Sequence, residues 1–332
     1  MAEPGVLNPI DEVHAAREEI EAAPDAEEYR VLRRLATNPR NFFAVSFGGG
    51  SLHGLAGNCT LAALLEELGL RPHVREVWGT SAGALVGGAW SGGLRSTTIL
   101  DRLLDGSVGP IHKPSWRHLA TSAIRFVARR GLPEGLVPGD RIRAAVERGL
   151  PVRSFEECEI PFRAIACTDD GLGRKVVFEK GPLSEAILAS MSIPGIFLPI
   201  RDWSGGDHGY MDGGIVEKTP LLSIIERHAR AARDLELFVL CTHFDGGHTL
   251  RSPQGFLQRL VHAVQRAEDV VWTYQLEQAR GAPGCKFAVL NPRIEHGGMF
   301  EFEMLRFNYL WSRRAFKAQL SNPELPKRMW GR

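Results

Sequence analysis

Residues 74–83 read Val-Arg-Glu-Val-Trp-Gly-Thr-Ser-Ala-Gly, and this stretch decides the fold. A short apolar run ends at Trp78, the pattern Gly-x-Ser-x-Gly occupies residues 79–83, and small and aliphatic residues continue from Ala84 to Trp90. A strand, this pattern and then a helix are typical of a nucleophile elbow, where the serine sits on a strained turn at the C-terminal edge of a sheet. The same five residues also fit an ordinary Gly/Ser turn, so other parts of the chain have to decide between the two.

The two glycines of the pattern have a steric role in an elbow. The turn brings strand and helix so close together that a Cβ atom at Gly79 or Gly83 would clash. The helix that begins after Ser81 would direct its N-terminal amides, and the positive end of its dipole, at any negative charge forming there. The sequence therefore predicts Ser81 as a nucleophile, with Gly79 and Gly83 supporting the elbow.

The bulk composition of the 332 residues is that of a globular protein, with 44% hydrophobic and 24% charged residues. The net charge of +1 provides no field of one sign, so we expect no nucleic-acid partner. The cysteines are scattered and odd in number, which indicates reduced thiols and neither a disulfide framework nor a zinc site. They are Cys59, Cys158, Cys167, Cys241 and Cys285.

The N-terminal residues lack the pattern of a secretory leader, and no apolar run approaches the length of a membrane span. We therefore expect a cytoplasmic protein that is at most peripheral at membranes. Export by a route without such a signature is left open.

Three segments are expected along the chain. Residues 1–40 are predicted to be a charged helical N-terminal extension that ends at Asn38-Pro39. Residues 41–322 form the expected catalytic domain, within which residues 96–150 are a helical insertion or lid candidate. Residues 323–332 are a tail.

The catalytic segment opens with the pattern of a βαβ unit. Strands are expected at residues 41–47 and 74–78, with a glycine loop at 48–50 and a helix from Leu55 to Leu68 between them. Short apolar strands joined by a crossover helix indicate a parallel sheet covered on both faces. Further strands are expected at 160–167, 175–179 and 237–242, and helices at 183–191, 256–280 and 304–320.

The glycine loop Gly48-Gly49-Gly50 lies 31 to 33 residues before Ser81, with one helix and one strand between them. The two loops are therefore expected at the same edge of the sheet, where glycine amides can approach an oxyanion closely. A dinucleotide-binding turn is the competing interpretation. The spacing of the third glycine and the absence of an acidic residue after the second strand argue against it.

The proton acceptor for Ser81 is left open by spacing alone. His243 and His248 follow a buried strand, in the Ser-Asp-His order of an α/β-hydrolase triad. Asp212 and Asp245 are each followed by two glycines, and a carboxylate can also act directly on a serine. Each Asp-Gly pair is by itself an ordinary turn signal.

Taken together, these motifs resemble those of the patatin-like phospholipase family. The resemblance covers roughly residues 42–320 and rests on the glycine loop, the elbow and the sequence Met211-Asp212-Gly213-Gly214. The segment 189–199, Ala-Ser-Met-Ser-Ile-Pro-Gly-Ile-Phe-Leu-Pro, is similar to the stretch that precedes the aspartate in the family. This lead-in singles out Asp212 over Asp245.

The resemblance implies a three-layer α/β/α fold, with a central, mostly parallel sheet, a helical insertion and C-terminal helices. It implies Ser81 as nucleophile, Asp212 as general base, Gly48, Gly49 and Gly50 as the oxyanion hole, and Gly213 and Gly214 as loop support. The implied reaction is hydrolysis of a phospholipid or other lipid ester through an acyl-enzyme, of phospholipase A or lysophospholipase type. It needs neither a metal nor an organic cofactor.

The chain departs from the family pattern in two places. The glycine loop is one residue longer than usual, and His53 stands where a basic residue is common. After the aspartate motif, Glu217-Lys218-Thr219 precedes Pro220, where many relatives carry Asn.

Two other functions compete with the lipid acyl hydrolase. One is an α/β-hydrolase esterase with a triad completed by His243 or His248. The other is a catalytically weak, lipid-binding module that keeps the fold.

Residues 113–130 are expected to form a basic amphipathic helix, with an apolar stripe that includes Trp116 and Ile124. Such a helix fits peripheral membrane contact or a lid, and it equally fits a surface helix packed on the core.

Overall fold

The computed structural model describes residues 9–25, 27–105, 139–194, 196–197, 199–201, 203, 208–231, 234–245, 256–294 and 301–321. The predicted amphipathic helix at 113–130, His248 and the tail at 323–332 lie outside these ranges. Of the predicted insertion at 96–150, the structure describes helix α6 (Ser96–Leu104) and helix α8 (Gly139–Gly149).

An eight-stranded sheet forms the centre of the molecule. Its parallel part runs in the order β3, β2, β1, β7, β8. Strands β4, β5 and β6 extend it with antiparallel pairs. The strand bounds are β1 (Asn41–Phe47), β2 (Glu76–Thr80), β3 (Phe162–Thr168), β4 (Lys175–Phe178), β5 (Ile200–Arg201), β6 (Gly209–Asp212), β7 (Glu236–Thr242) and β8 (Cys285–Leu290).

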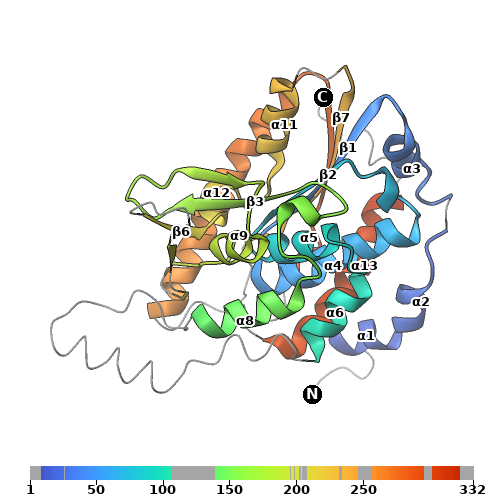
Figure 1. The fold of residues 1–332 in the computed structure, drawn as a ribbon. Helices are drawn as coiled ribbons and strands as arrows, with labels where there is room; N and C mark the ends of the chain where they lie inside the picture. Colours follow the sequence, from blue (N-terminus) through green and yellow to red (C-terminus); the bar gives the residue numbers. More distant parts are fainter. Residues whose placement is uncertain are drawn as a thin grey trace.

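Helices cover both faces of this sheet (Figure 1). A hydrophobic core lies on each face of the sheet, and the side chains of β1 alternate between the two. Phe43, Val45 and Phe47 belong to one core, and Phe42 and Ala44 belong to the other. The first core includes α4 (Ser51–Glu67), α5 (Ala82–Ser91) and α13 (Leu305–Ser321), and the second includes α11 (Leu221–Arg230) and α12 (Phe256–Arg280). The predicted three-layer α/β/α fold with a mostly parallel sheet is confirmed.

Strand β6 meets β2 end to end along one edge of β3. Residues 164–165 of β3 pair with both β2 and β4, and residues 166–167 pair with both β4 and β6. Because a strand has only two edges, β2 and β6 must share one of them. Thr80 is opposite Ile165 and Asp212 is opposite Ala166, so the ends of the two strands lie about one residue rise, roughly 3.3 Å, apart along β3.

Several element bounds differ from the sequence-based expectation. The first crossover helix, expected from Leu55, begins at Ser51 directly after the glycine loop. The strand expected to end at Trp78 continues through Thr80, because Gly79 pairs with Phe47 and Thr80 pairs with Ile165. Strands β5, β6 and β8 were not expected, and β5 and β6 are too short to show a clear alternation.

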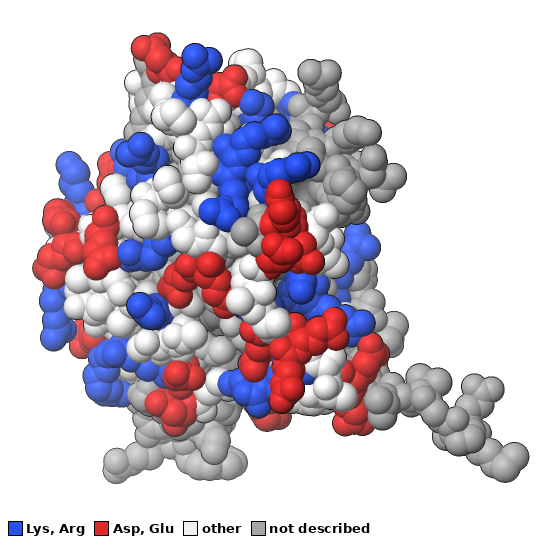
Figure 2. Space-filling model, turned by 90° about the vertical axis from the view of Figure 1, so that its right-hand side faces the viewer, with Lys and Arg blue, Asp and Glu red and all other residues white. Residues whose placement is uncertain are grey.

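The N-terminal helices α1 (Pro9–Ala15), α2 (Arg17–Glu21) and α3 (Arg30–Thr37) add to the larger core. Val13, Ile20 and Tyr29 are buried in the same cluster as residues of α13. Basic and acidic side chains are interspersed over the face shown in Figure 2. None of the helices that the structure describes is both long and apolar enough to traverse a bilayer.

Candidate active site

Ser81 stands at the elbow between β2 and α5. Its backbone has φ 53° and ψ −121°, a left-handed conformation that is rare for a residue with a side chain. A Cβ at Gly79 would lie 2.4 Å from the carbonyl oxygen of Gly83, and one at Gly83 would lie 2.0 Å from the carbonyl oxygen of Phe47. Both glycines are therefore required by the close approach of strand and helix.

Asp212, the last residue of β6, lies beside this elbow. The carboxylate is buried, with 5% of the residue exposed, and its Oδ1 accepts the Gly214 N–H at 2.7 Å. Its Oδ2 is buried as well, and the Ser81 side chain lies close enough to the carboxylate to lower its pKa. The meeting of β2 and β6 along β3 thus brings the predicted nucleophile and the predicted base together.

The pKa of Asp212 is raised from an ordinary value of 3.8 to about 7. Desolvation by burial is the main cause, and the nearby Glu268 carboxylate adds to it. The Ser81 side chain, the Gly214 N–H and the Lys218 ammonium act in the opposite direction. A carboxylate with this pKa can accept and release a proton near neutral pH.

The segment around residues 190–192 holds both residues in place. Ser190 Oγ accepts the backbone N–H of Ser81 at 2.8 Å and donates to the Ile165 carbonyl at 2.5 Å. The carbonyl of Ser192 accepts the Asp212 N–H at 2.9 Å. The lead-in that singled out Asp212 in the sequence therefore makes hydrogen bonds to both Ser81 and Asp212.

The glycine loop ends at the N-terminus of α4, next to the elbow. A Cβ at Gly54 would lie 3.0 Å from that of Ala82, so the first turns of α4 and α5 are in contact. The positive ends of both helix dipoles are therefore directed toward the same region beside Ser81.

The three glycines of the loop are not equivalent as oxyanion donors. Gly48 donates its N–H to Thr242 Oγ1 at 2.9 Å, and Gly49 donates to the Lys218 carbonyl at 2.8 Å. These two amides are engaged in the observed conformation. The oxyanion role of Gly48, Gly49 and Gly50 stays a prediction.

The loop is fixed by two polar residues that sequence reasoning missed. Asn58 donates to the Gly48 carbonyl at 2.9 Å and accepts from Thr242 Oγ1 at 2.5 Å. Thr242 in turn accepts the Gly48 N–H. Both residues are buried within largely apolar segments. Their polar side chains were therefore the only feature of the sequence that could have indicated this role.

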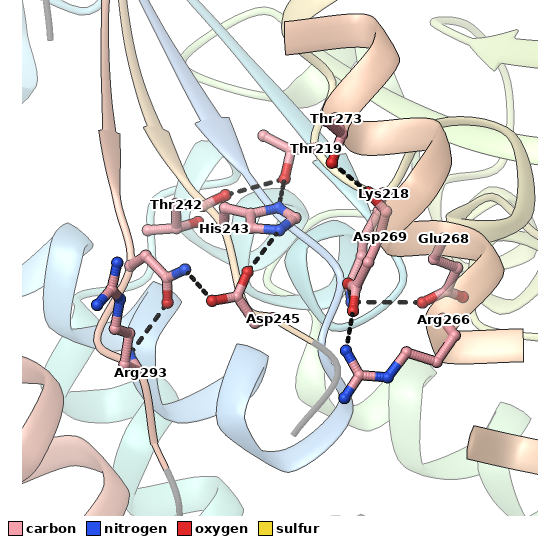
Figure 3. A network of polar contacts seen from close by, with 11 residues as sticks. Lys218, Thr219, Thr242, His243, Asp245, Arg266, Glu268, Asp269, Thr273 and Arg293 are labelled. Carbon is pink, nitrogen blue, oxygen red and sulfur yellow. Dashed lines mark hydrogen bonds and ion pairs between the residues drawn. The ribbon is translucent and has the colours of Figure 1, made fainter. Parts of the chain in front are cut away.

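His243, one of the two alternative bases, is directed elsewhere. Its Nδ1 lies 3.0 Å from Thr219 Oγ1 and its Nε2 lies 3.3 Å from Asp245 Oδ1 (Figure 3). Its ring also stacks on that of Trp272. Both ring nitrogens thus face groups other than Ser81. Asp245, whose pKa this contact lowers to about 2, also accepts from Asn291 at 2.6 Å.

One described group has the donor set of a metal site. Ligand atoms of His243, Asp245 and Asp269 all lie within 4.8 Å of one another. The Lys218 ammonium lies 3.4 Å from Asp269 Oδ1, where it supplies the positive charge that a metal ion would otherwise bring.

Comparison with known families identifies the family of this chain. Residues 45–225, more than half of the chain, match the family model described as patatin-like phospholipase. The chain belongs to the patatin-like phospholipase family.

Curated proteins of two mycobacteria are similar to part of this chain. An uncharacterized NTE family protein of Mycobacterium tuberculosis H37Rv is 30% identical over 202 residues, which are 58% of this chain and 47% of that protein. An NTE family protein of Mycobacterium bovis gives the same values. The chain therefore spans about half the length of these curated relatives.

Two crystal structures show a distant likeness in fold. VipD from Legionella pneumophila has a TM-score of 0.40 and 11% identity, with 85% of this chain and 66% of that chain covered. The type III effector protein ExoU has a TM-score of 0.39 and 15% identity, with 85% and 53% covered.

Gly213 and Gly214 follow Asp212 in a tight turn. A Cβ at Gly213 would lie 2.2 Å from the Ile165 carbonyl oxygen, so the turn after the base is as tightly packed as the elbow. The segment Glu217-Lys218-Thr219, where the sequence departs from the family pattern, makes hydrogen bonds to the elbow strand and the glycine loop. Thr80 donates to the Glu217 carbonyl at 2.9 Å, and Lys218 holds Gly49 as described above.

Proposed function

We propose that this chain is a serine acyl hydrolase of lipid carboxylic esters, of phospholipase A or lysophospholipase type, with Ser81 as nucleophile and Asp212 as general base. The observation that carries the proposal is the buried Asp212 carboxylate at the end of β6, which lies within reach of the Ser81 side chain at the strained elbow. Membership of the patatin-like phospholipase family supports a lipid ester as the substrate.

The first half-reaction forms an acyl-enzyme. Asp212 takes the hydroxyl proton as Ser81 Oγ attacks the ester carbonyl carbon, and the carbonyl oxygen becomes an oxyanion. Amides at the N-termini of α4 and α5, among them those of Gly50 and Ala82, stabilise this charge. The tetrahedral intermediate then expels the alcohol, which takes the proton from Asp212.

The second half-reaction releases the fatty acid. Water gives a proton to Asp212 and attacks the acyl carbonyl, and the tetrahedral intermediate collapses with release of Ser81 Oγ. Asp212 returns its proton to that oxygen, so that the free enzyme is restored. In each half-reaction Asp212 first accepts a proton and then returns it, which suits a carboxylate whose pKa is about 7.

Substitution of the two residues tests the proposal. In Ser81→Ala and Asp212→Asn, kcat for a soluble ester should fall by about 1000-fold or more, as for removal of a nucleophile or base elsewhere. Labelling by a fluorophosphonate should be lost in Ser81→Ala. Wild-type turnover in Asp212→Asn would rule out the Ser-Asp mechanism.

The α/β-hydrolase alternative is tested by the double variant His243→Asn, His248→Ala. Retained turnover supports the dyad, whereas a loss as large as that of Ser81→Ala, with an unchanged circular dichroism spectrum, would favour a triad. Product analysis by mass spectrometry, on a phospholipid with two different acyl chains, then distinguishes phospholipase A from other lipid esterase activities.

A further inference from the structure

Lys218 is a buried cation between the glycine loop and α12. Only 4% of the residue is exposed, and its Nζ lies 3.4 Å from Glu268 Oε2 and 3.4 Å from Asp269 Oδ1 (Figure 3). A buried ammonium is tolerated only with such close counter-charges. The pairing connects the turn after α10 (Gly214–Glu217) to the middle of α12, some 50 residues later.

The same pair lies against both halves of the proposed catalytic site. The Lys218 carbonyl holds the Gly49 N–H, which fixes the glycine loop. A Cβ built on Gly214 would lie 2.8 Å from Glu268 Oε1 and 3.1 Å from Asp212 Oδ1. The two carboxylates therefore lie close to the same point beside the Gly214 backbone.

We propose that Lys218 and Glu268 are positioning residues for the base, with Glu268 placing a second negative charge beside Asp212 and Lys218 offsetting it. The proposal rests on the function assigned above to Ser81 and Asp212. It also gives a physical role to Lys218 in the segment where the sequence departs from the family pattern.

The charged and titratable groups that face Asp212 come from four elements. Glu268 on α12 raises the pKa of Asp212, and Lys218 after α10 lowers it. Ser81 at the end of β2 also lowers it, while Cys167 on β3 has a raised pKa and stays neutral at the working pH. Lys218 additionally faces Asp269, which pairs with Arg266, and it lowers the pKa of His243.

These charge relations predict that substitution of Glu268 and substitution of Lys218 shift the acid limb of the pH profile in opposite directions. Glu268→Gln removes the charge that disfavours ionisation of Asp212, so the acid limb of kcat/KM should move to lower pH by about 1 unit. Lys218→Met removes the charge that favours ionisation, so the limb should move to higher pH by a similar amount. Lys218→Arg keeps the charge and should return the limb toward the wild-type position.

The experiment measures kcat/KM against pH on a soluble short-chain ester for the wild type and these three variants. Glu277→Gln is the matched control, because it makes the same change on an exposed residue of α12 and should leave the limb unmoved. Glu268→Gln leaves Lys218 paired with Asp269, so the folded state keeps a counter-charge for the buried ammonium.

Two results would overturn the proposal. Equal losses of kcat in Glu268→Gln and Lys218→Met without movement of the acid limb would show a purely structural pair, and shifts of the same sign would contradict the charge relation. If Lys218→Met does not fold, the Glu268→Gln shift decides alone. Wild-type turnover in Ser81→Ala would instead mean that the proposed function itself is wrong.

Discussion

At the scale of single residues, burial of Asp212 favours its proposed role as a base and reduces the stability of the folded state. The carboxylate of Asp212 is desolvated, and its pKa is raised from 3.8 to about 7. The folded state therefore binds a proton over a pH range in which the unfolded chain has already released it. Stability contributed by this group is lost as the pH rises through that range.

The asparagine variant should reveal this penalty. Asp212→Asn keeps an acceptor for the Gly214 N–H but has no charge to bury, so its unfolding free energy should exceed that of the wild type at pH 8 by up to a few kcal/mol. At pH 4 the difference should vanish, because Asp212 is then protonated in the folded state. Urea unfolding at the two pH values measures it, and a variant less stable than wild type at pH 8 would contradict the assignment.

The same pKa fixes the direction of the pH dependence of turnover. Only ionised Asp212 can accept the Ser81 proton, so kcat/KM should rise about tenfold per pH unit below pH 7 and level off above it. A soluble ester avoids changes in a lipid interface with pH. An acid limb near pH 4 would show that the base is a solvated carboxylate and not Asp212.

At the scale of elements, the elbow depends on the distance between β1, β2 and α5. Gly83→Ala would place a Cβ 2.0 Å from the Phe47 carbonyl oxygen, and the backbone atoms there cannot move without breaking the sheet. We expect a loss of more than about 3 kcal/mol in unfolding free energy, or failure to fold.

Gly149→Ala at the end of α8 is the matched control, since a Cβ there meets nothing within 4 Å. Its melting temperature should equal or slightly exceed that of the wild type. Equal melting temperatures for the two variants would mean that α5 can move away from β1, and the proposed rigidity of the elbow would be wrong.

The elbow and the first βαβ unit could be predicted from sequence because their signals are local. Gly79, Ser81 and Gly83 fall within five residues, and apolar runs flank them on either side. Asp212 lies on a four-residue antiparallel strand with no periodicity to detect, and spacing alone did not separate it from Asp245. Only the resemblance to a known family selected it.

Interactions between distant segments could not be predicted in the same way. Glu268 and Asp269 belong to a long amphipathic helix, where acidic residues ordinarily face solvent. Their pairing with Lys218 depends on how α12 packs over the turn after α10, which no sequence pattern records. The hydrogen bonds of Gly48 and Gly49 likewise depend on Thr242 and Lys218, which lie 194 and 169 residues further along the chain.

At the scale of the whole molecule, the two ends of the described chain are joined by one buried side chain. Arg313 on α13 donates to the Ile20 carbonyl at 2.7 Å and to the Ala22 carbonyl at 3.3 Å, and it forms a salt bridge with Glu67 of α4. The helices at residues 9–21 are therefore fixed to the core by polar contacts as well as by apolar burial.

Replacing this arginine should weaken the molecule as a whole. Arg313→Met leaves the carbonyls of Ile20, Glu21 and Ala22 and the partly buried Glu67 carboxylate without their donor, and it should reduce the unfolding free energy by about 3–5 kcal/mol. Arg314→Met removes only an exposed pair with Glu12 and should change it by less than about 1 kcal/mol. Urea unfolding of both variants, with limited proteolysis of residues 9–25, measures the difference. If the two variants unfold alike while the N-terminal segment alone becomes sensitive to protease, these helices form a separate unit and do not contribute to the cooperative core.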